Sequence, residues 1–411
     1  MLTNNILLIG YLGLYIILYL LRATKKSNFS PLSIMNFLLI YFAFSAFSSF
    51  VYYNVISIFI SKYDDLTLPP FIYLAVCNIV AFIPFFKYEN NEPSLIISDR
   101  QMKVLDKIAI LLAICAILPF IETVFQIPKA LVSSEGLAEI YEEKLEGAEV
   151  ENYMSFISRK FFYIILILDY FTAPLLFVQM TKKVVNKKIV IGLILCLVTL
   201  WAYNMIRGGR STMVQSILYT IVCYLLYRKH ISDSVNKRIV YYGTVIISVG
   251  AVALMAVTLS RFIARDSSVY NNPFEWMALY FGEGNLNFNV DMWNVADKTS
   301  GGFKTIPLIM SIFEGHMITV PEIWAAGDSL GIPGNYYYTW IGQIYSDWNV
   351  FLTPVIIVFL TSIFSKQVSS SGYISIISLL SSCIIIMEKI MEKKERKHKS
   401  SKWHTIFWAC F

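Results

Sequence analysis

The sequence predicts an all-α polytopic integral membrane protein with about 10 transmembrane helices and one large extracytoplasmic loop. Its 411 residues are 56% hydrophobic and only 15% charged, and the mean hydropathy is +0.59. A soluble protein would carry roughly a quarter charged residues. No cleavable signal peptide is evident, because the first apolar stretch is followed by Arg22, Lys25 and Lys26, the flanking pattern of a retained span.

Apolar windows of about 20 residues, the length that crosses a bilayer, predict the individual spans. These windows are 5–21, 33–60, 69–86, 106–126, 161–180, 189–205, 213–227, 239–259, 350–365 and, with a weaker signal, 373–387. The second window is long enough to tilt or to contain a kink. The sixth and seventh are short, as is common where a membrane protein opens a polar cavity.

The chain therefore divides into four parts. Residues 1–259 hold eight spans with short loops, 260–349 form the large outer loop, 350–388 hold the last spans, and 389–411 form a basic tail. If 373–387 crosses the membrane, this tail lies outside, against the positive-inside trend. Either that segment is not a full span, or the tail is not native to the fold.

The distribution of Lys and Arg predicts the orientation. The loops after the first, third, fifth and seventh windows are all rich in Lys and Arg, which places them in the cytoplasm. The outer side receives an acidic segment at 135–151, which is interpreted as a solvated helix rather than a sugar site. The net charge of +6 then belongs mostly to the cytoplasmic rim, and nothing indicates nucleic-acid binding.

The six cysteines show no CxxC pattern and no grouping with histidine. Five of them lie inside apolar windows, so they are interpreted as small core residues rather than as metal ligands or disulfides. Gly282-Glu283-Gly284 is a lone Gly-x-Gly without a nucleotide-binding context.

The most informative motif is Arg207-Gly208-Gly209-Arg210, which separates the two short spans on the predicted outer side. A guanidinium is costly next to hydrocarbon, so such arginines indicate function. Glycine lets the backbone turn tightly and approach a ligand closely. Two forked, permanently charged donors suit a diphosphate. The alternative is that Arg207 and Arg210 only reach toward lipid headgroups.

The outer loop 260–349 carries most of the remaining polar chemistry. Arg261 and Arg265 stand four residues apart after the eighth span, so they share a helix face, although interfacial anchoring explains them equally well. Five of the eight tryptophans lie in this loop, with Tyr336-Tyr337-Tyr338 and scattered carboxylates. Aromatic faces beside carboxylates and amides suit sugars, but aromatic residues also gather at membrane interfaces.

At these residues the chain resembles the bacterial oligosaccharide repeat-unit polymerases, the Wzy-type O-antigen and capsular polymerases. The arginine turn is similar to that family's Arg-x-Gly-x-Arg element, and 334–348, which reads GNYYYTWIGQIYSDW, is similar to its Asn-x-(Tyr/Phe)-Thr…Gly…Tyr-x-Asp-Phe-Gly segment. The resemblance covers the layout of nearly the whole chain, but only these short motifs in residues. This chain has Asp347-Trp348-Asn349 where the family usually has Asp-Phe-Gly.

The resemblance implies a fold similar to GT-C-like glycosyltransferases and a location in the bacterial cytoplasmic membrane, with the active site facing the periplasm or exterior. It implies a growing glycan on undecaprenyl diphosphate as donor and a repeat unit on the same lipid as acceptor. A flippase and a chain-length regulator are the implied protein partners. An acceptor hydroxyl attacks the anomeric carbon and undecaprenyl diphosphate leaves, so the site must stabilise charge on a phosphate oxygen.

Site roles follow from that reaction, with no cofactor and no metal expected, because no Asp-x-Asp pair stands in the outer loops. Arginine side chains take the place of the metal by donating hydrogen bonds to the phosphate oxygens. The acceptor hydroxyl needs a base, for which His316 is favoured over the carboxylates, because imidazole exchanges protons near neutral pH. The predicted catalytic residues are Arg207, Arg210, His316 and Glu314. The predicted substrate-binding residues are Arg261, Arg265, Asp328, Asn335, Tyr338, Trp340, Tyr345 and Asp347.

Two other functions remain open. An O-antigen ligase would share the fold and the arginines but transfer the glycan to lipid A core. A flippase or other transporter would also place arginines in a cavity, although transporters usually have repeated halves, which this chain lacks. Asp169, inside the fifth window, is either a cavity residue, the partner of an arginine, or a helix–helix hydrogen-bonding group.

Overall fold

The described part of the chain is entirely helical. The structure is a computed structural model. It describes residues 2–25, 33–55, 63–91, 97, 99–132, 154–206, 210–264, 273–295, 299–305, 310, 314, 320–332 and 339–370. Helices and short turns account for these residues, and no strand occurs among them. The all-α class is therefore confirmed for this part.

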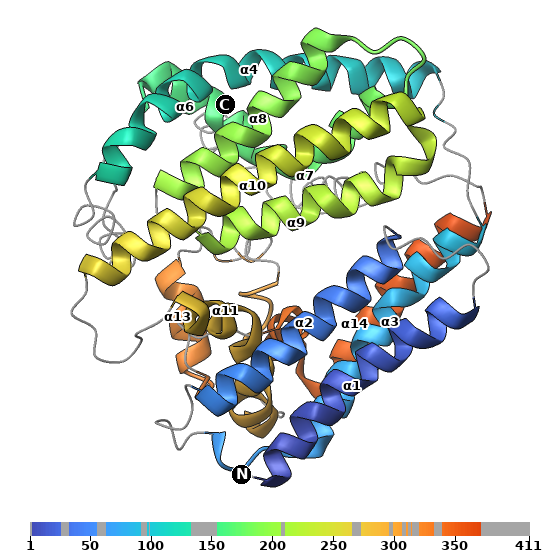
Figure 1. Cartoon of the computed structure of the whole chain (residues 1–411), viewed down its shortest axis with the longest axis vertical. Coiled ribbons are helices and arrows are strands. Elements are labelled where there is room, and N and C mark those ends of the chain that lie inside the picture. Colours follow the sequence, from blue (N-terminus) through green and yellow to red (C-terminus); the bar gives the residue numbers. More distant parts are fainter. Residues whose placement is uncertain are drawn as a thin grey trace, which may run out of the picture.

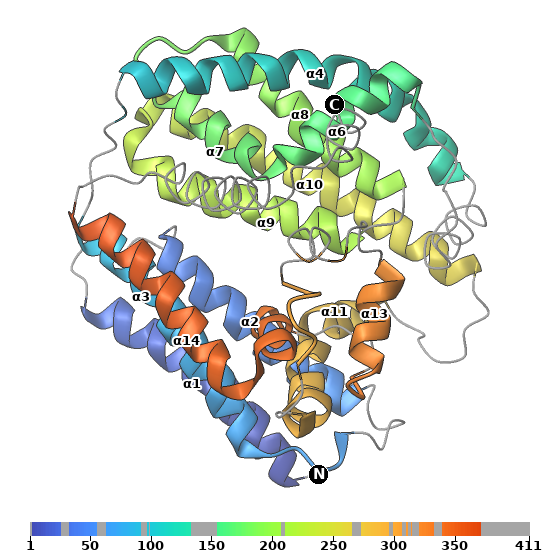
Figure 2. The same ribbon diagram turned by 180° about the vertical axis from the view of Figure 1, so that it is seen from behind.

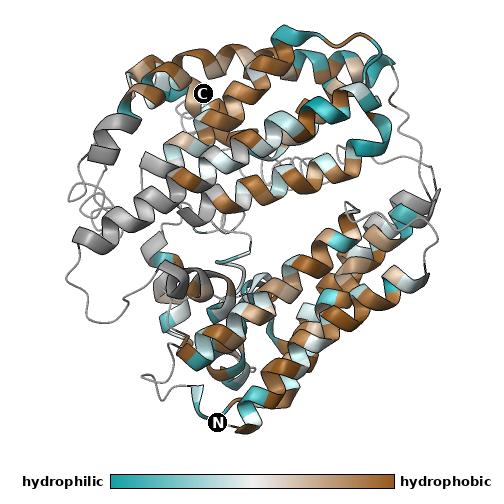
Figure 3. Ribbon diagram, viewed as in Figure 1, coloured by the Kyte–Doolittle hydropathy of each residue, from teal (hydrophilic) through white to brown (hydrophobic). Residues whose placement is uncertain are grey.

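Among the described residues, five helices are long and apolar enough to cross a membrane, and a bent helix pair provides a sixth candidate. The five are α1 (Leu2–Lys25), α2 (Ile34–Val55), α3 (Leu68–Asn91), α4 (Asp99–Val132) and α14 (Trp340–Ser370). Many large apolar side chains on these helices face outward, for example Phe125 at 72% and Phe359 at 63% exposure. Figure 3 shows apolar residues along the outer faces of the helices. We therefore describe the chain as a multi-pass membrane protein, because soluble proteins rarely expose apolar surfaces of this extent to water.

The predicted fifth span is not one continuous helix. It consists of α6 (Phe156–Ile167) and α7 (Asp169–Met180), which meet at an angle of 75°. Leu168 leaves the helical conformation, and the Thr172 hydroxyl donates to its carbonyl at 3.3 Å. The Tyr219 hydroxyl of α9 donates to the Tyr170 carbonyl at 2.7 Å. Side chains thus bond to backbone carbonyls at the break, as a break at membrane depth requires.

The next three predicted windows also form helices: α8 (Lys187–Ile206), α9 (Arg210–Tyr227) and α10 (Asp233–Ala264). A short turn, η3 (Arg228–His230), joins α9 to α10. The Asn236 amide fixes this turn by donating to the Arg228 and Ile231 carbonyls, both at 3.0 Å. The window 373–387 and the tail 389–411 lie outside the described residues.

The helices form two groups, which Figures 1 and 2 show from opposite sides. The first bundle contains α1, α2, α3, α14 and α11 (Pro273–Asn287), and its core cluster draws on all five. The second bundle contains α4 and α6 to α10, with a separate core cluster. A small cluster of Ile34, Tyr88 and Leu225 joins the two, and the Tyr88 hydroxyl donates to the Leu226 carbonyl.

The predicted outer loop contributes helices to the first bundle. Besides α11 it contains a π-helical turn η4 (Phe288–Met292), a turn η5 (Trp293–Val295) and α13 (Val320–Asp328). The Ser45 hydroxyl, halfway along α2, donates to the Phe281 carbonyl of α11 at 2.7 Å. Segment 260–349 therefore does not stand clear of the spans, because α11 reaches the middle of α2.

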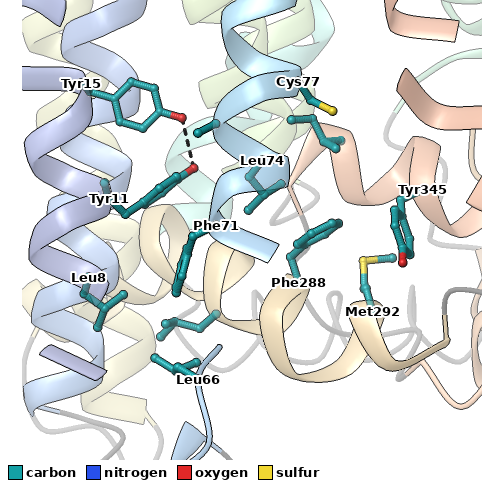
Figure 4. Packing of buried hydrophobic residues seen from close by; sticks show 14 of the residues in the cluster. Leu8, Tyr11, Tyr15, Leu66, Phe71, Leu74, Cys77, Phe288, Met292 and Tyr345 are labelled. Atoms are coloured by element: carbon teal, nitrogen blue, oxygen red, sulfur yellow. Dashed lines mark hydrogen bonds between the residues drawn. The ribbon is translucent and has the colours of Figure 1, made fainter. Parts of the chain in front are cut away.

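The core of the first bundle is aromatic where these segments meet. Figure 4 shows Tyr11, Tyr15 and Phe71 on one side of the cluster and Phe288 and Tyr345 on the other. The Tyr11 and Phe71 ring centroids are 5.1 Å apart. Residues from the first and last spans thus share one core.

Candidate functional site

The helix α14 consists of two helices that meet at Asn349. This residue has φ 61° and ψ −178°, a conformation that glycine adopts easily and other residues seldom do. Its Oδ1 accepts hydrogen bonds from the backbone N–H groups of Phe351 at 3.0 Å and Leu352 at 3.2 Å. Asn349 is therefore the N-cap of the span that follows.

The residues before Asn349 form a half-helix, 340–348, that folds back against α3. The Trp340 indole N–H donates to Asn78 Oδ1 at 3.0 Å, whereas the Val350 carbonyl accepts from the Tyr73 hydroxyl at 3.0 Å. Asn78 lies more than one helical turn further along α3 than Tyr73. The start of the half-helix therefore reaches deeper along α3 than its end, as in a re-entrant segment.

Asp347 fastens a neighbouring turn to this half-helix. Its side chain is 1% exposed. One carboxylate oxygen accepts from the Thr305 backbone N–H and hydroxyl, each at 2.6 Å, and from the Lys304 N–H at 3.1 Å. The other oxygen accepts from the Ser300 hydroxyl. The Trp348 indole N–H adds a bond to the Thr305 hydroxyl at 3.1 Å. These donors fix the loop 299–305 over the half-helix.

Lys304 is the counter-charge at this position. Burial lowers the pKa of its ammonium, while the charges of Asp347 and Asp328 act in the opposite direction. Asp328 is exposed, at the end of α13. Two of the predicted substrate-binding carboxylates therefore act on one lysine that the sequence did not single out.

Tyr345 lies on the inner face of the half-helix and is 1% exposed. Its ring centroid is 5.2 Å from that of Phe288, 5.7 Å from Tyr73 and 6.3 Å from Trp293. Phe288 begins the π-helical turn, an element that often occurs at functional sites. Tyr345 and Trp293, two of the aromatic residues expected to face sugars, thus pack against each other on the buried side of the half-helix.

A row of buried asparagines connects this turn to the spans. The Asn285 amide donates to the Ser45 and Ser49 hydroxyls of α2, at 3.0 Å and 2.9 Å. The Tyr63 hydroxyl donates to Asn287 Oδ1 at 2.7 Å. Asn289 exchanges two hydrogen bonds with the Thr67 backbone. Asparagine at every second position within an apolar segment is the sequence signal for this network.

Five of the predicted site residues lie outside the described residues. They are Arg207, Arg265, His316, Asn335 and Tyr338. Glu314 is exposed. Trp340, Tyr345 and Asp347 come together on the half-helix, and Asp328 approaches it through Lys304. Their role in binding substrate stays a prediction.

The arginine–glycine motif stands between α8 and α9 in the chain, since Ile206 ends α8 and Arg210 begins α9, and residues 207–209 lie outside the described residues. Arg261 is in the last turn of α10. Since α9 and α10 run in opposite directions from the turn η3, the backbones of Arg210 and Arg261 lie toward the same end of the second bundle (Figure 1). Helix α10 also contacts α11 of the first bundle.

Among the described residues, no three His, Cys, Asp or Glu side chains are arranged to hold a metal ion. The four described cysteines, 77, 115, 196 and 223, are buried and unpaired. Comparison with known proteins gives no matching family model, no matching curated protein and no matching solved structure.

Proposed function

We propose that this protein is a glycosyltransferase that polymerises a bacterial surface polysaccharide. It transfers a growing glycan from undecaprenyl diphosphate to the non-reducing end of a lipid-linked repeat unit, at the outer face of the cytoplasmic membrane. The observation that carries the proposal is the Arg207-Gly208-Gly209-Arg210 motif, which stands between α8 and α9 in the chain. Two fork-shaped donors on a glycine turn suit a diphosphate leaving group.

Three features support the proposal. The protein has several candidate membrane spans, as an enzyme acting on polyprenyl-linked substrates needs. The backbones of Arg210 and Arg261 lie toward the same end of the second bundle, and α10 contacts α11 of the first bundle. The half-helix 340–348 carries the residues that resemble the polymerase motif, and Asp347 anchors it.

In the proposed reaction, Arg207 and Arg210 hold the diphosphate, with Arg261 and Arg265 as further donors. His316 accepts the proton of the attacking hydroxyl, and Glu314 is the alternative base. Asp328, Asn335, Tyr338 and Trp340 hold sugar hydroxyls and ring faces. Tyr345 and Asp347 do not touch the sugars, because both are buried, and they hold the half-helix 340–348 in position.

The deciding experiment is deletion of the gene in its native host, followed by gel analysis of the surface polysaccharide. Loss of the long-chain ladder with a single capped repeat unit remaining supports a polymerase. Loss of that single unit as well contradicts the proposal and indicates the ligase or the flippase. Complementation with Arg210→Lys, which keeps the charge but removes the fork, should restore only short chains. The control is Arg238→Lys, at an exposed position near the start of α10.

The absence of a metal requirement has its own test. The purified protein should extend its lipid-linked substrate in EDTA, because the arginines supply the positive charge that stabilises the diphosphate leaving group. Strict dependence on Mg²⁺ or Mn²⁺ would contradict this part of the proposal while leaving the polymerase activity in place.

A further inference from the structure

A groove of about 480 Å³ runs between α3 and α14, away from the surface proposed to act on glycans. Val80, Ile83 and Lys87 line it from α3. These residues are three and four positions apart, so they form one stripe along the helix. The opposite wall belongs to the second half of α14 and has the same spacing, with Val358, Thr361, Ser362 and Ser365. The groove is open because the side chains on the α14 wall are small.

The two ends of the groove differ in chemistry. One end is apolar, with Val80, Ile83 and Val358. Seven residues further along α3, about 10 Å at the helical rise, Lys87 faces the hydroxyl groups of α14 across the groove. An ammonium with several hydroxyls at one end and an apolar trough at the other matches a molecule with an anionic head and a hydrocarbon chain.

The surroundings of the groove indicate where that molecule comes from. Ile83 and Phe86 on α3 are 40% and 49% exposed, and Phe359 on α14 is 63% exposed. Because both helices are candidate spans, these apolar side chains contact lipid and the groove opens into the bilayer. Lys87 lies two residues before the end of the candidate span Leu68–Glu89, at the level of the headgroups.

We propose that this groove binds one anionic glycerophospholipid. Its phosphate lies against Lys87, its glycerol and ester oxygens meet the hydroxyls of Thr361 and Ser362, and one acyl chain follows Val80, Ile83 and Val358. In the orientation that the loop charges predict, this lipid belongs to the cytoplasmic leaflet. It links the third span to the last one and so closes the first bundle on that side.

The test is native mass spectrometry of the full-length protein released from detergent containing equal amounts of phosphatidylglycerol and phosphatidylcholine. The wild-type protein should retain one phosphatidylglycerol. Lys87→Gln should weaken retention about fivefold, since one lysine near a lipid phosphate contributes about 1 kcal/mol. Ser362→Phe fills the groove and leaves the charge in place, so it should abolish retention.

Two matched controls separate the groove from general effects. Lys183→Gln removes a lysine from an exposed loop, and Val355→Phe adds a ring to an exposed face of α14, where Val355 is 60% exposed. Both should retain the lipid like the wild type. Wild-type retention in both Lys87→Gln and Ser362→Phe, or equal retention of the two lipids, would overturn the proposal. Displacement of the lipid by millimolar inorganic phosphate would also overturn it, because the site would then be one for a free anion.

Discussion

The two bundles are held together by different kinds of contact. In the first bundle, buried polar side chains bond to distant segments, as Asn78 does with Tyr15 and Trp340, and Asn289 with Thr67. In the second bundle, several hydroxyls bond back to their own helix. Thr199 donates to Leu195 four residues earlier at 2.7 Å, and Thr220 to Ser216 at 2.8 Å. Bonds to the same helix impose no register on its neighbours.

This difference suggests a division of labour. A network of hydrogen bonds between distant segments has few alternative arrangements, whereas bonds within one helix leave its position relative to its neighbours to packing. The first bundle therefore fixes the half-helix 340–348 in place. The second bundle has interhelical bonds as well, for example from Gln179 to Asp106 and from Trp201 to Ser216. Ile206 and Arg210, which stand on either side of residues 207–209 in the chain, belong to helices of the second bundle.

The largest effect should come from Asp347→Ala in the first bundle. This change removes a carboxylate whose charge acts on the Lys304 ammonium, and it removes the acceptor for two backbone N–H groups and two hydroxyls. Removing one partner of a buried charged group costs about 3–5 kcal/mol. Thermal unfolding in detergent should show a large drop in Tm. A Tm within about 2 °C of the wild type would mean that the anchor is dispensable.

Gly282→Ala should cause the second largest loss of stability, because α11 touches the backbone of α2 at this glycine. An added Cβ would lie 2.4 Å from the Ser48 carbonyl carbon and from the Ser49 nitrogen. Overpacking of this kind costs about 3 kcal/mol. Neither Ser48→Gly nor Ser49→Gly should rescue the variant, since the clash is with backbone. Gly13→Ala is the control, because nothing lies within 4 Å of its Cβ position.

Gly192→Ala is the counterpart in the second bundle, where α8 meets α4. Its Cβ would lie 2.2 Å from the Ala113 Cβ and 2.8 Å from the Ala113 Cα. The expected cost is about 1–2 kcal/mol, and Ala113→Gly should recover part of it because most of the clash is with a side chain. The control Gly243→Ala has nothing within 4 Å. Equal costs in the two bundles, with no rescue in either, would remove the proposed difference in tolerance.

Asn349 offers a smaller effect in the first bundle. Asn349→Ala loses the N-cap bonds to Phe351 and Leu352, at an expected cost of about 1–2 kcal/mol. Asn349→Gly should be neutral or stabilising, because glycine adopts positive φ without strain. Urea or thermal unfolding of both variants tests this. A glycine variant as unstable as the alanine variant would show that the cap, and not the backbone conformation, decides the position.

The smallest effect concerns pH and the second bundle. Burial, and to a lesser extent the charge of Lys229, lower the pKa of His230 below its ordinary value of 6.5. The unfolded chain therefore binds the proton more readily, so stability falls as pH drops below about 6.5, by at most about 1.4 kcal/mol per pH unit. His230→Gln should flatten this part of the Tm profile between pH 7 and pH 5. Profiles of equal slope would rule out His230 as the cause.

The spans of this protein could be predicted from sequence because hydrophobicity is a local property. The nine windows from 5–21 to 350–365 overlap described helices, one of them a bent pair, and five or six of these are candidate spans. The ninth window, 350–365, starts directly after the cap at Asn349. The break at Leu168 could not be predicted, since the apolar sequence continues through it. The break depends on Tyr219, which lies two helices later.

The candidate site was predictable only in its motif residues. Asp347 and Tyr345 stand in a recognisable segment, but Ser300, Lys304 and Thr305 have no pattern that connects them to it. Their bonds to Asp347 span more than 40 residues and exist only in the folded chain. Gly282 likewise belongs to a Gly-x-Gly without nucleotide-binding context, and its role is close packing against α2.

The bond between Asn78 and Trp340 joins residues 262 positions apart, with the whole second bundle between them in the chain. During synthesis, α1 to α3 therefore lack part of their packing partners until α11 and α14 have been synthesised. In contrast, α4 to α10 are consecutive in the chain and can pack against one another earlier. Such long-range closure is slow. We expect a chain released after Ala264 to protect its second bundle from protease and to leave α2 and α3 sensitive, because their partners are missing.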